Sequence, residues 1–184
     1  LADPLSLLVQ PPLEFVLPKP APVALRRCPP DDPDKRRQGN LYEHRVRRAT
    51  STDAVTFLVD DTILLEHASV PDALVHSDGT VWVYYVNGNP GQHAIFIAEL
   101  GDDGLLHPFD CVRLDGAVNG NAVDPDVMVQ PDGTIRLFYF EGWFMSGGPP
   151  PPGTDSPFYT AVSEDGIHFT VEGKVYESYF QMHQ

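Results

Sequence analysis

The residues best suited to chemistry in this sequence are carboxylates, and three of them stand at repeated positions. Asp72 and Asp124 each belong to one copy of a repeated motif, and Glu177 matches Glu66 at a spacing of 111 residues. Two carboxyl groups on either side of a bound molecule can act as general acid and general base when one is protonated and the other ionised. The seven histidines and two cysteines show no metal-ligand spacing, so we expect no metal and no cofactor.

A loop rich in glycine and proline carries candidate ligand contacts. Trp143 and Phe144 open the segment from Gly142 to Pro157, which contains four consecutive prolines and reads as a surface loop. Their rings are suited to stacking on a flat ligand, and we place Asp126 with them as a ligand contact. Aromatic residues inside an apolar run are more often core, which is the expectation for Trp82, Tyr84 and Tyr85.

An internal repeat predicts the elements that position these residues. Val70 to Gly88 recurs 54 residues later as Asp124 to Gly142, with eight of nineteen positions identical. Each copy has a short apolar run, an Asp-Gly pair and a longer apolar run, which predicts a β-hairpin because glycine, and less readily aspartate, tolerates positive φ. The second runs, 81–86 and 135–140, are apolar almost throughout, so we expect other sheets to cover both of their faces.

Polar turns extend this rhythm over the rest of the chain. They begin near Ala49, Ala98 and Ala161, and short strands are expected after them at 62–66, 111–115 and 174–177. About four strands in a period of ~50 residues are typical of a β-propeller blade. A β-sandwich with two similar hairpins is the alternative.

At this level the chain resembles the five-bladed propeller glycoside hydrolases of family 43 and the related propeller glycosidases and glycoside phosphorylases. The resemblance spans about Tyr42 to Tyr179 and rests on SVPDA, AVDPDV, the paired DGT turns and AVSEDGIHF. It implies an all-β fold of four-stranded antiparallel blades. It also implies hydrolysis of arabinose- or xylose-containing plant polysaccharides or oligosaccharides by an inverting mechanism.

The resemblance also suggests roles for the carboxylates. The family uses a base Asp, an Asp that tunes the pKa of the acid, and an acid Glu, each on a different blade around a central funnel. Asp124 precedes Pro125 and matches the tuning Asp, while Asp72 follows its proline and matches an Asp near the funnel. Glu177 is the candidate acid, and Asp3 before Pro4 is a weaker candidate base because no Asp-Gly turn and aromatic strand follow it.

Only part of such a ring is expected. The 143 residues from Tyr42 onward make about 2.6 periods of 54 where the family has five blades. The chain is then a cut fragment, a shortened member, or one half of a homodimer whose two halves complete one propeller. A non-catalytic carbohydrate-binding or scaffolding module is the alternative function. Phosphorolysis is less favoured, because Arg113, Arg136 and Lys174 are the only basic residues after Arg48.

Composition limits the partners. The net charge is −14, and it divides into +3 for residues 1–48 and −17 for the remainder, so nucleic acid and anionic membrane surfaces are not expected partners. The excess of Asp over Lys is typical of salt-tolerant proteins, with GC-rich codon usage as an equal alternative.

The chain divides into a Pro-rich extended arm, residues 1–41, and the propeller domain, residues 42–184. Cys28 in the arm and Cys111 in a strand could form one disulfide if the protein is exported, and free thiols are at least as compatible with the sequence. The sequence leaves open whether the protein is secreted or cytoplasmic.

Overall fold

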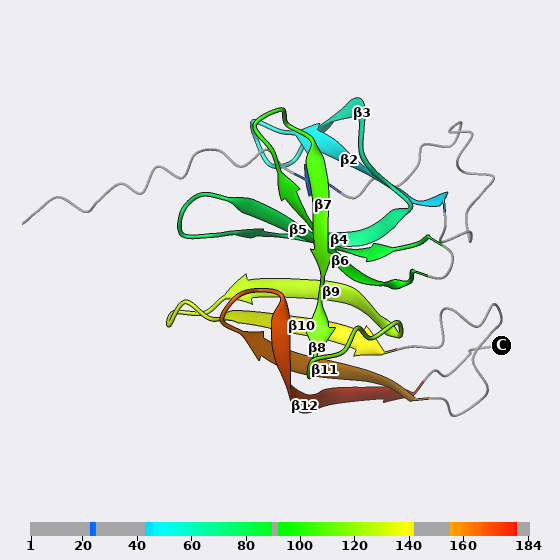
Figure 1. Cartoon of the computed structure of the whole chain (residues 1–184). Helices are drawn as coiled ribbons and strands as arrows, with labels where there is room; N and C mark the ends of the chain where they lie inside the picture. Colours follow the sequence, from blue (N-terminus) through cyan, green and yellow to red (C-terminus); the bar gives the residue numbers. More distant parts are fainter. Residues whose placement is uncertain (1–22, 25–42, 90–91, 142–154, 180–184) are drawn as a thin grey trace, which may run out of the picture.

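All the regular elements in the described part of the chain are β-strands (Figure 1). The computed structural model describes residues 23–24, 43–89, 92–141 and 155–179. The strands are β1 (Val23–Ala24), β2 (Arg45–Thr50), β3 (Leu58–Glu66), β4 (Ala68–Val75), β5 (Val81–Asn87), β6 (Ala94–Leu100), β7 (Leu106–Cys111), β8 (Arg113–Leu114), β9 (Ala122–Val129), β10 (Ile135–Glu141), β11 (Asp155–Ser163) and β12 (His168–Tyr179).

The strands form three sheets that follow one another along the chain and fan out side by side (Figure 1). Their strand orders are β1-β2-β3, β4-β5-β6-β7 and β8-β12-β11-β10-β9. Neighbouring strands pair antiparallel, except that the short β8 pairs parallel with β12. Consecutive sheets of antiparallel strands stacked in a fan define part of a β-propeller, as predicted, rather than a two-sheet sandwich.

Both predicted hairpins are present, with β4 paired to β5 and β9 paired to β10. Only the glycines of the turns have positive φ, at 89° for Gly79 and 88° for Gly133. Asp78 and Asp132 do not share this conformation. Asp78 and Asp132 instead accept hydrogen bonds from the backbone N–H groups two residues on, of Thr80 and Thr134, at 2.9 and 3.0 Å. The aspartate closes the turn through its side chain, and the glycine supplies the φ.

The core consists of two apolar layers, one on each side of the middle sheet. Val83 and Tyr85 of β5 pack toward the first sheet, whereas Tyr84 packs toward the last sheet. Both faces of β5 are therefore covered, as predicted, and Tyr84 and Tyr85 are core residues. In β10, Ile135, Leu137 and Tyr139 are buried against the middle sheet, while Phe138 on the other face is only half-buried. Among the described residues, the expectation of two covered faces is thus wrong for β10.

Some predicted strand boundaries differ from those in the structure. The strand expected at 62–66 begins earlier, at Leu58, and the one expected at 111–115 divides into the end of β7 and the short β8. The strand expected at 174–177 belongs to the long β12. Within the segment expected to be an arm, Val23–Ala24 pairs with Arg47–Arg48 of β2.

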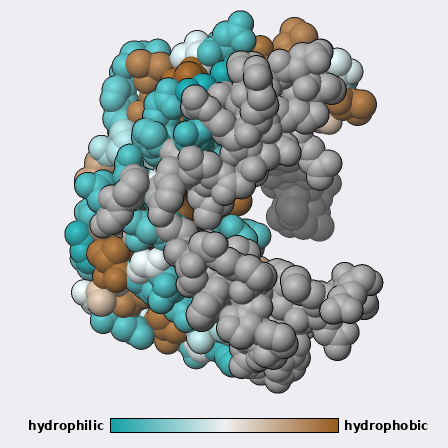
Figure 2. Space-filling view, turned by 90° about the vertical axis from the view of Figure 1, so that its right-hand side faces the viewer, coloured by the Kyte–Doolittle hydropathy of each residue, from teal (hydrophilic) through white to brown (hydrophobic). Residues whose placement is uncertain are grey.

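The visible described surface is mostly hydrophilic, with separate hydrophobic patches (Figure 2). Cys111 is a free, half-buried thiol in the described part, and Cys28 lies outside the described residues. Within the described ranges there is no helix long and apolar enough to cross a membrane.

Candidate functional site at the ends of the inner strands

The innermost strands of the middle and last sheets, β4 and β9, lie next to each other (Figure 1). The carboxylate of Asp72 joins them, because its Oδ2 accepts a 2.7 Å hydrogen bond from the backbone N–H of Val127. Its Oδ1 accepts a second one, of 2.9 Å, from the N–H of Ala73. Asp72 therefore fixes the spacing of the two inner strands.

Each inner strand has a bulge at the residue that precedes its proline. The pairing of β4 with β5 skips from Ser69 to Asp72, and the pairing of β9 with β10 shifts in the same place one repeat later. The skipped residues Val70 and Asp124 have positive φ, of 42° and 52°. Proline has no N–H to give to a sheet, so it is tolerated at a bulge. A β-branched residue at positive φ is strained by about 1–3 kcal/mol, so packing around the bulge must hold Val70 in place.

The two bulges meet at a cavity of about 110 Å³. It lies at the end of the sheets where β2, β4 and β9 begin and β5 ends, opposite the DGT turns. Eight residues from five segments line it: His44, Ser69, Val70, Val86, Gly88, His93, Val123 and Asp124. Asp124 is the one carboxylate among these lining residues.

The carboxyl group of Asp124 has an altered affinity for protons. Desolvation by the surrounding residues raises its pKa above the ordinary value of 3.8, although Asp124 as a whole is exposed to solvent. Burial disfavours the charged form of an acid and so favours its protonated form. Asp124 combines this shift with a strained backbone and a place in a cavity, which favours a functional role.

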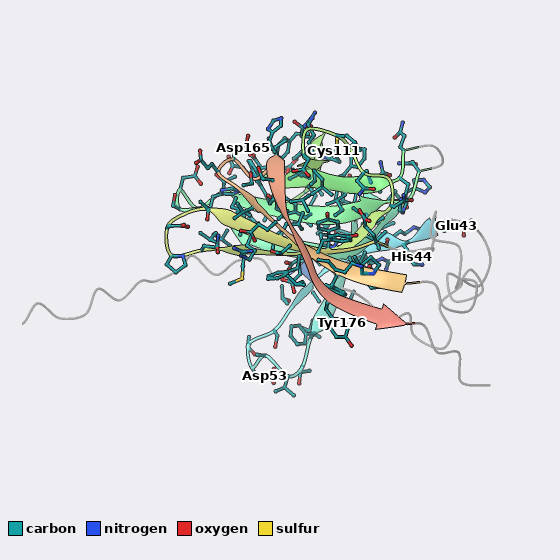
Figure 3. The ribbon with its side chains drawn as sticks, turned by 90° about the horizontal axis from the view of Figure 1, so that it is seen from below. Glu43, His44, Asp53, Cys111, Asp165 and Tyr176 are labelled. Atoms are coloured by element: carbon teal, nitrogen blue, oxygen red, sulfur yellow. The ribbon has the colours of Figure 1, made fainter. Side chains whose placement is uncertain are left out.

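Two histidines that the sequence reasoning missed also line the cavity. His44 lies next to Glu43 at the start of β2, at the opposite end of the sheets from Asp165 (Figure 3). Nδ1 of His93 is within hydrogen-bond distance of the carbonyl oxygen of Gly120, which requires a proton on Nδ1. Neutral His93 then keeps Nε2 as an acceptor. Neither histidine stands in a repeated motif, so no local pattern marked them.

Of the three carboxylates predicted to act together, Asp124 lines this cavity. The carboxylate of Asp72 is hydrogen-bonded between β4 and β9, and Asp72 does not line the cavity. Asp126 is exposed and pairs with Phe138, on the face of β9 that points away from the middle sheet.

Glu177 lies on β12, three strands from β9 in the sheet order β9-β10-β11-β12. At about 4.8 Å per strand, the backbones of β9 and β12 are roughly 14 Å apart within the sheet. Glu66 and Glu177, which the offset of 111 residues relates, lie on β3 and β12. Neither strand is an innermost strand of its sheet. Trp143, Phe144 and Asp3 lie outside the described residues. Among the described residues, no group of three or more His, Cys, Asp or Glu is arranged to hold a metal ion.

Solved structures of glycoside hydrolases share this arrangement of sheets. A thermostable family-43 glycoside hydrolase matches with a TM-score of 0.54 and 14% identity, over 72% of this chain and 46% of that chain. An endo-1,4-β-xylanase from Bacteroides thetaiotaomicron matches with a TM-score of 0.52 and 19% identity, over 71% and 46%. A structure from work on family GH130, described as containing hydrolases that target β-1,2 mannosidic linkages in Candida mannan, matches with a TM-score of 0.51 and 15% identity, over 72% and 41%.

These matches show that the chain has part of the propeller fold of these structures. The chain spans less than half of the length of each of these structures. The sequence itself matches no protein-family model and no curated protein.

Proposed function

We propose that this chain is part of a glycoside hydrolase in which Asp124 is a catalytic-site carboxyl group. The observation that carries the proposal is the place of Asp124, on a strained bulge of an inner strand with its carboxyl group in a cavity and its pKa raised by desolvation. The fold shared with glycoside hydrolases supports the reaction class. As substrates we propose arabinose- or xylose-containing plant polysaccharides or oligosaccharides.

The cavity offers suitable chemistry for a sugar. Inverting hydrolysis needs one carboxylic acid to protonate the leaving oxygen and one carboxylate to activate water, about 6.5–9.5 Å apart. Asp124 is suited to holding or tuning the proton, because its surroundings favour the neutral form. The hydroxyl of Ser69 and Nε2 of His93 are suited to binding sugar hydroxyl groups.

Water is favoured over phosphate as the second substrate. A phosphate would need cationic side chains at the site. The described lining residues include histidines but neither Arg nor Lys, and Arg136 and Arg113 pair with Glu172 and Asp110 instead. Hydrolysis is therefore proposed in preference to phosphorolysis.

A non-catalytic carbohydrate-binding module is the second candidate, and one observation favours it. Among the described lining residues the cavity has a single carboxylate, because Asp72 is used between the strands. One carboxyl group with histidine and serine can bind a sugar without cleaving it. The two candidates differ in whether product is released.

The test is an assay with 4-nitrophenyl α-L-arabinofuranoside and 4-nitrophenyl β-D-xyloside, together with calorimetric titration of xylo- and arabino-oligosaccharides. We expect turnover by the unaltered protein and a loss of about 10²–10⁴-fold in Asp124→Asn. Asp102→Asn, on an exposed turn, is the matched control. Binding without turnover would support the binding module. Equal turnover by Asp124→Asn would remove Asp124 from the mechanism.

A further inference from the structure

The last sheet of the fan has a face that the described residues leave uncovered. Asp126 of β9 and Phe138 of β10 are paired on this face, and Met128 lies two residues further along β9. Met128 is 49% exposed, Asp126 is exposed and Phe138 is half-buried. We call this group of three residues the open face.

The repeat shows what such a face does when it is covered. The counterparts of the open face, 54 residues earlier, are Asp72, Leu74 and Tyr84 of the middle sheet. Leu74 is only 4% exposed and Tyr84 is 0% exposed, because the last sheet packs on them. Asp72 accepts the backbone N–H of Val127 on the neighbouring inner strand. These three residues therefore form an interface between sheets, through apolar burial and one carboxylate-to-backbone hydrogen bond.

We propose that the open face binds a second copy of this chain, and that Asp126 accepts a backbone N–H from the strand that packs on it, as Asp72 does from Val127. The interface between the middle and last sheets would then continue through the open face. Asp126, predicted from the sequence to contact the ligand, becomes a residue of the interface between copies.

The size of the related structures favours a second copy as the occupant. About 70% of this chain matches 41% to 46% of each glycoside hydrolase structure described above. Two copies of the matched part therefore approach the size of one such propeller. A closed pair would also cover sheet faces that would otherwise stay exposed to water. Association of two copies does not depend on the proposed activity.

The experiment is light scattering after size exclusion, over a range of concentrations of the full chain. Two single variants alter the charge of the open face without removing a buried group: Asp126→Lys reverses a charge and Met128→Lys adds one. Asp102→Lys makes the same change of charge on a distant exposed turn. Melting curves establish that each variant is folded, and Asp126→Asn is a milder variant if the lysine variants melt early.

We expect the unaltered protein and Asp102→Lys to have twice the chain mass of 20.3 kDa. The dimers of the open-face variants should dissociate more readily, because a charged acceptor or an apolar contact is lost. Their dissociation constants should be about tenfold to a hundredfold higher than that of the unaltered protein. A monomeric unaltered protein at every concentration would overturn the proposal. A dimer that survives the open-face variants would also overturn it, because the contact would then lie elsewhere.

Discussion

The hydroxyl group of Tyr84 donates a 2.9 Å hydrogen bond to the carbonyl oxygen of Gly166, from the centre of the middle sheet to the β11–β12 turn of the last sheet. Tyr84 is fully buried, and desolvation raises the pKa of its hydroxyl group. Gly166 has a φ of 76°. A β carbon at this position would lie 2.7 Å from the hydroxyl oxygen of Tyr84 and 3.0 Å from atoms of Ile135 and Trp82. The close approach of the two sheets therefore depends on the absence of a side chain at Gly166.

Gly166→Ala should lower the free energy of unfolding by about 2–4 kcal/mol, since the left-handed backbone and the overpacked interface both cost energy. Gly79→Ala is the matched control, because Gly79 has a φ of 89° but no atom within 4 Å of the added β carbon. We expect it to lose only the backbone part, about 1–2 kcal/mol. Urea unfolding of both variants measures the difference. Equal losses would show that the interface tolerates the methyl group.

Asp72→Ala should destabilise the protein by about 1–3 kcal/mol, because the N–H of Val127 loses its acceptor between two sheets. Asp72→Asn keeps an acceptor oxygen and should lose less. Chemical denaturation compares both with Asp102→Ala, an exposed change expected to stay within about 0.5 kcal/mol. If Asp72→Ala matched this control, the carboxylate would not hold the inner strands together.

Asp165 should make stability depend on pH in the acid range. Desolvation raises its pKa, but hydrogen bonds from the backbone N–H groups of His168 and Ile167, the His168 ring and Ser163 outweigh this and hold the pKa well below 3.8. A lowered pKa in the folded state means that the ionised form stabilises the fold above pH 3.8, and that this stabilisation is lost as the pH falls below 3.8. Asp165→Asn should therefore melt below the unaltered protein at pH 7, with a difference that shrinks as the pH falls below 3.8. A difference that is constant with pH would contradict the role of the charge.

Asp124→Asn should have the opposite effect on stability. The pKa of Asp124 is raised in the folded state, so its contribution is full below pH 3.8 and is lost as the pH rises through the folded-state value. An amide that cannot ionise avoids this loss, and Asn tolerates positive φ well. We expect the variant to melt at a higher temperature than the unaltered protein at pH 7, with the gap closing below pH 3.8. A lower melting temperature at pH 7 would show that the ionised carboxylate supports the fold.

The sequence predicted the hairpins and the stacked sheets because these depend on local signals. Apolar runs and Asp-Gly turns recur at a fixed spacing, and each hairpin forms between neighbours in the chain. The site was harder to predict. Alternation along a strand cannot show that a bulge turns Asp124 toward the cavity and leaves Asp72 between the strands.

Long-range packing explains why the other features of the site could not be predicted from the sequence. His44 and His93 are 49 positions apart in the chain and reach one cavity only because the first two sheets stack. The strand position of Glu177 could not be predicted, because a repeat offset does not distinguish an outer strand from an inner one.

The paired bulges have a consequence for redesign. Val70 and Asp124 are the same position in two copies of one repeat, with the same unusual backbone, and their side chains line the same cavity. The two repeats thus place two equivalent residues at the cavity, and only one of them, Asp124, is an acid. Replacing Val70 with Asp would ease the backbone, because Asp adopts positive φ more readily than a β-branched residue. The same single change would give the cavity a second carboxyl group, at the position that the repeat makes equivalent to Asp124.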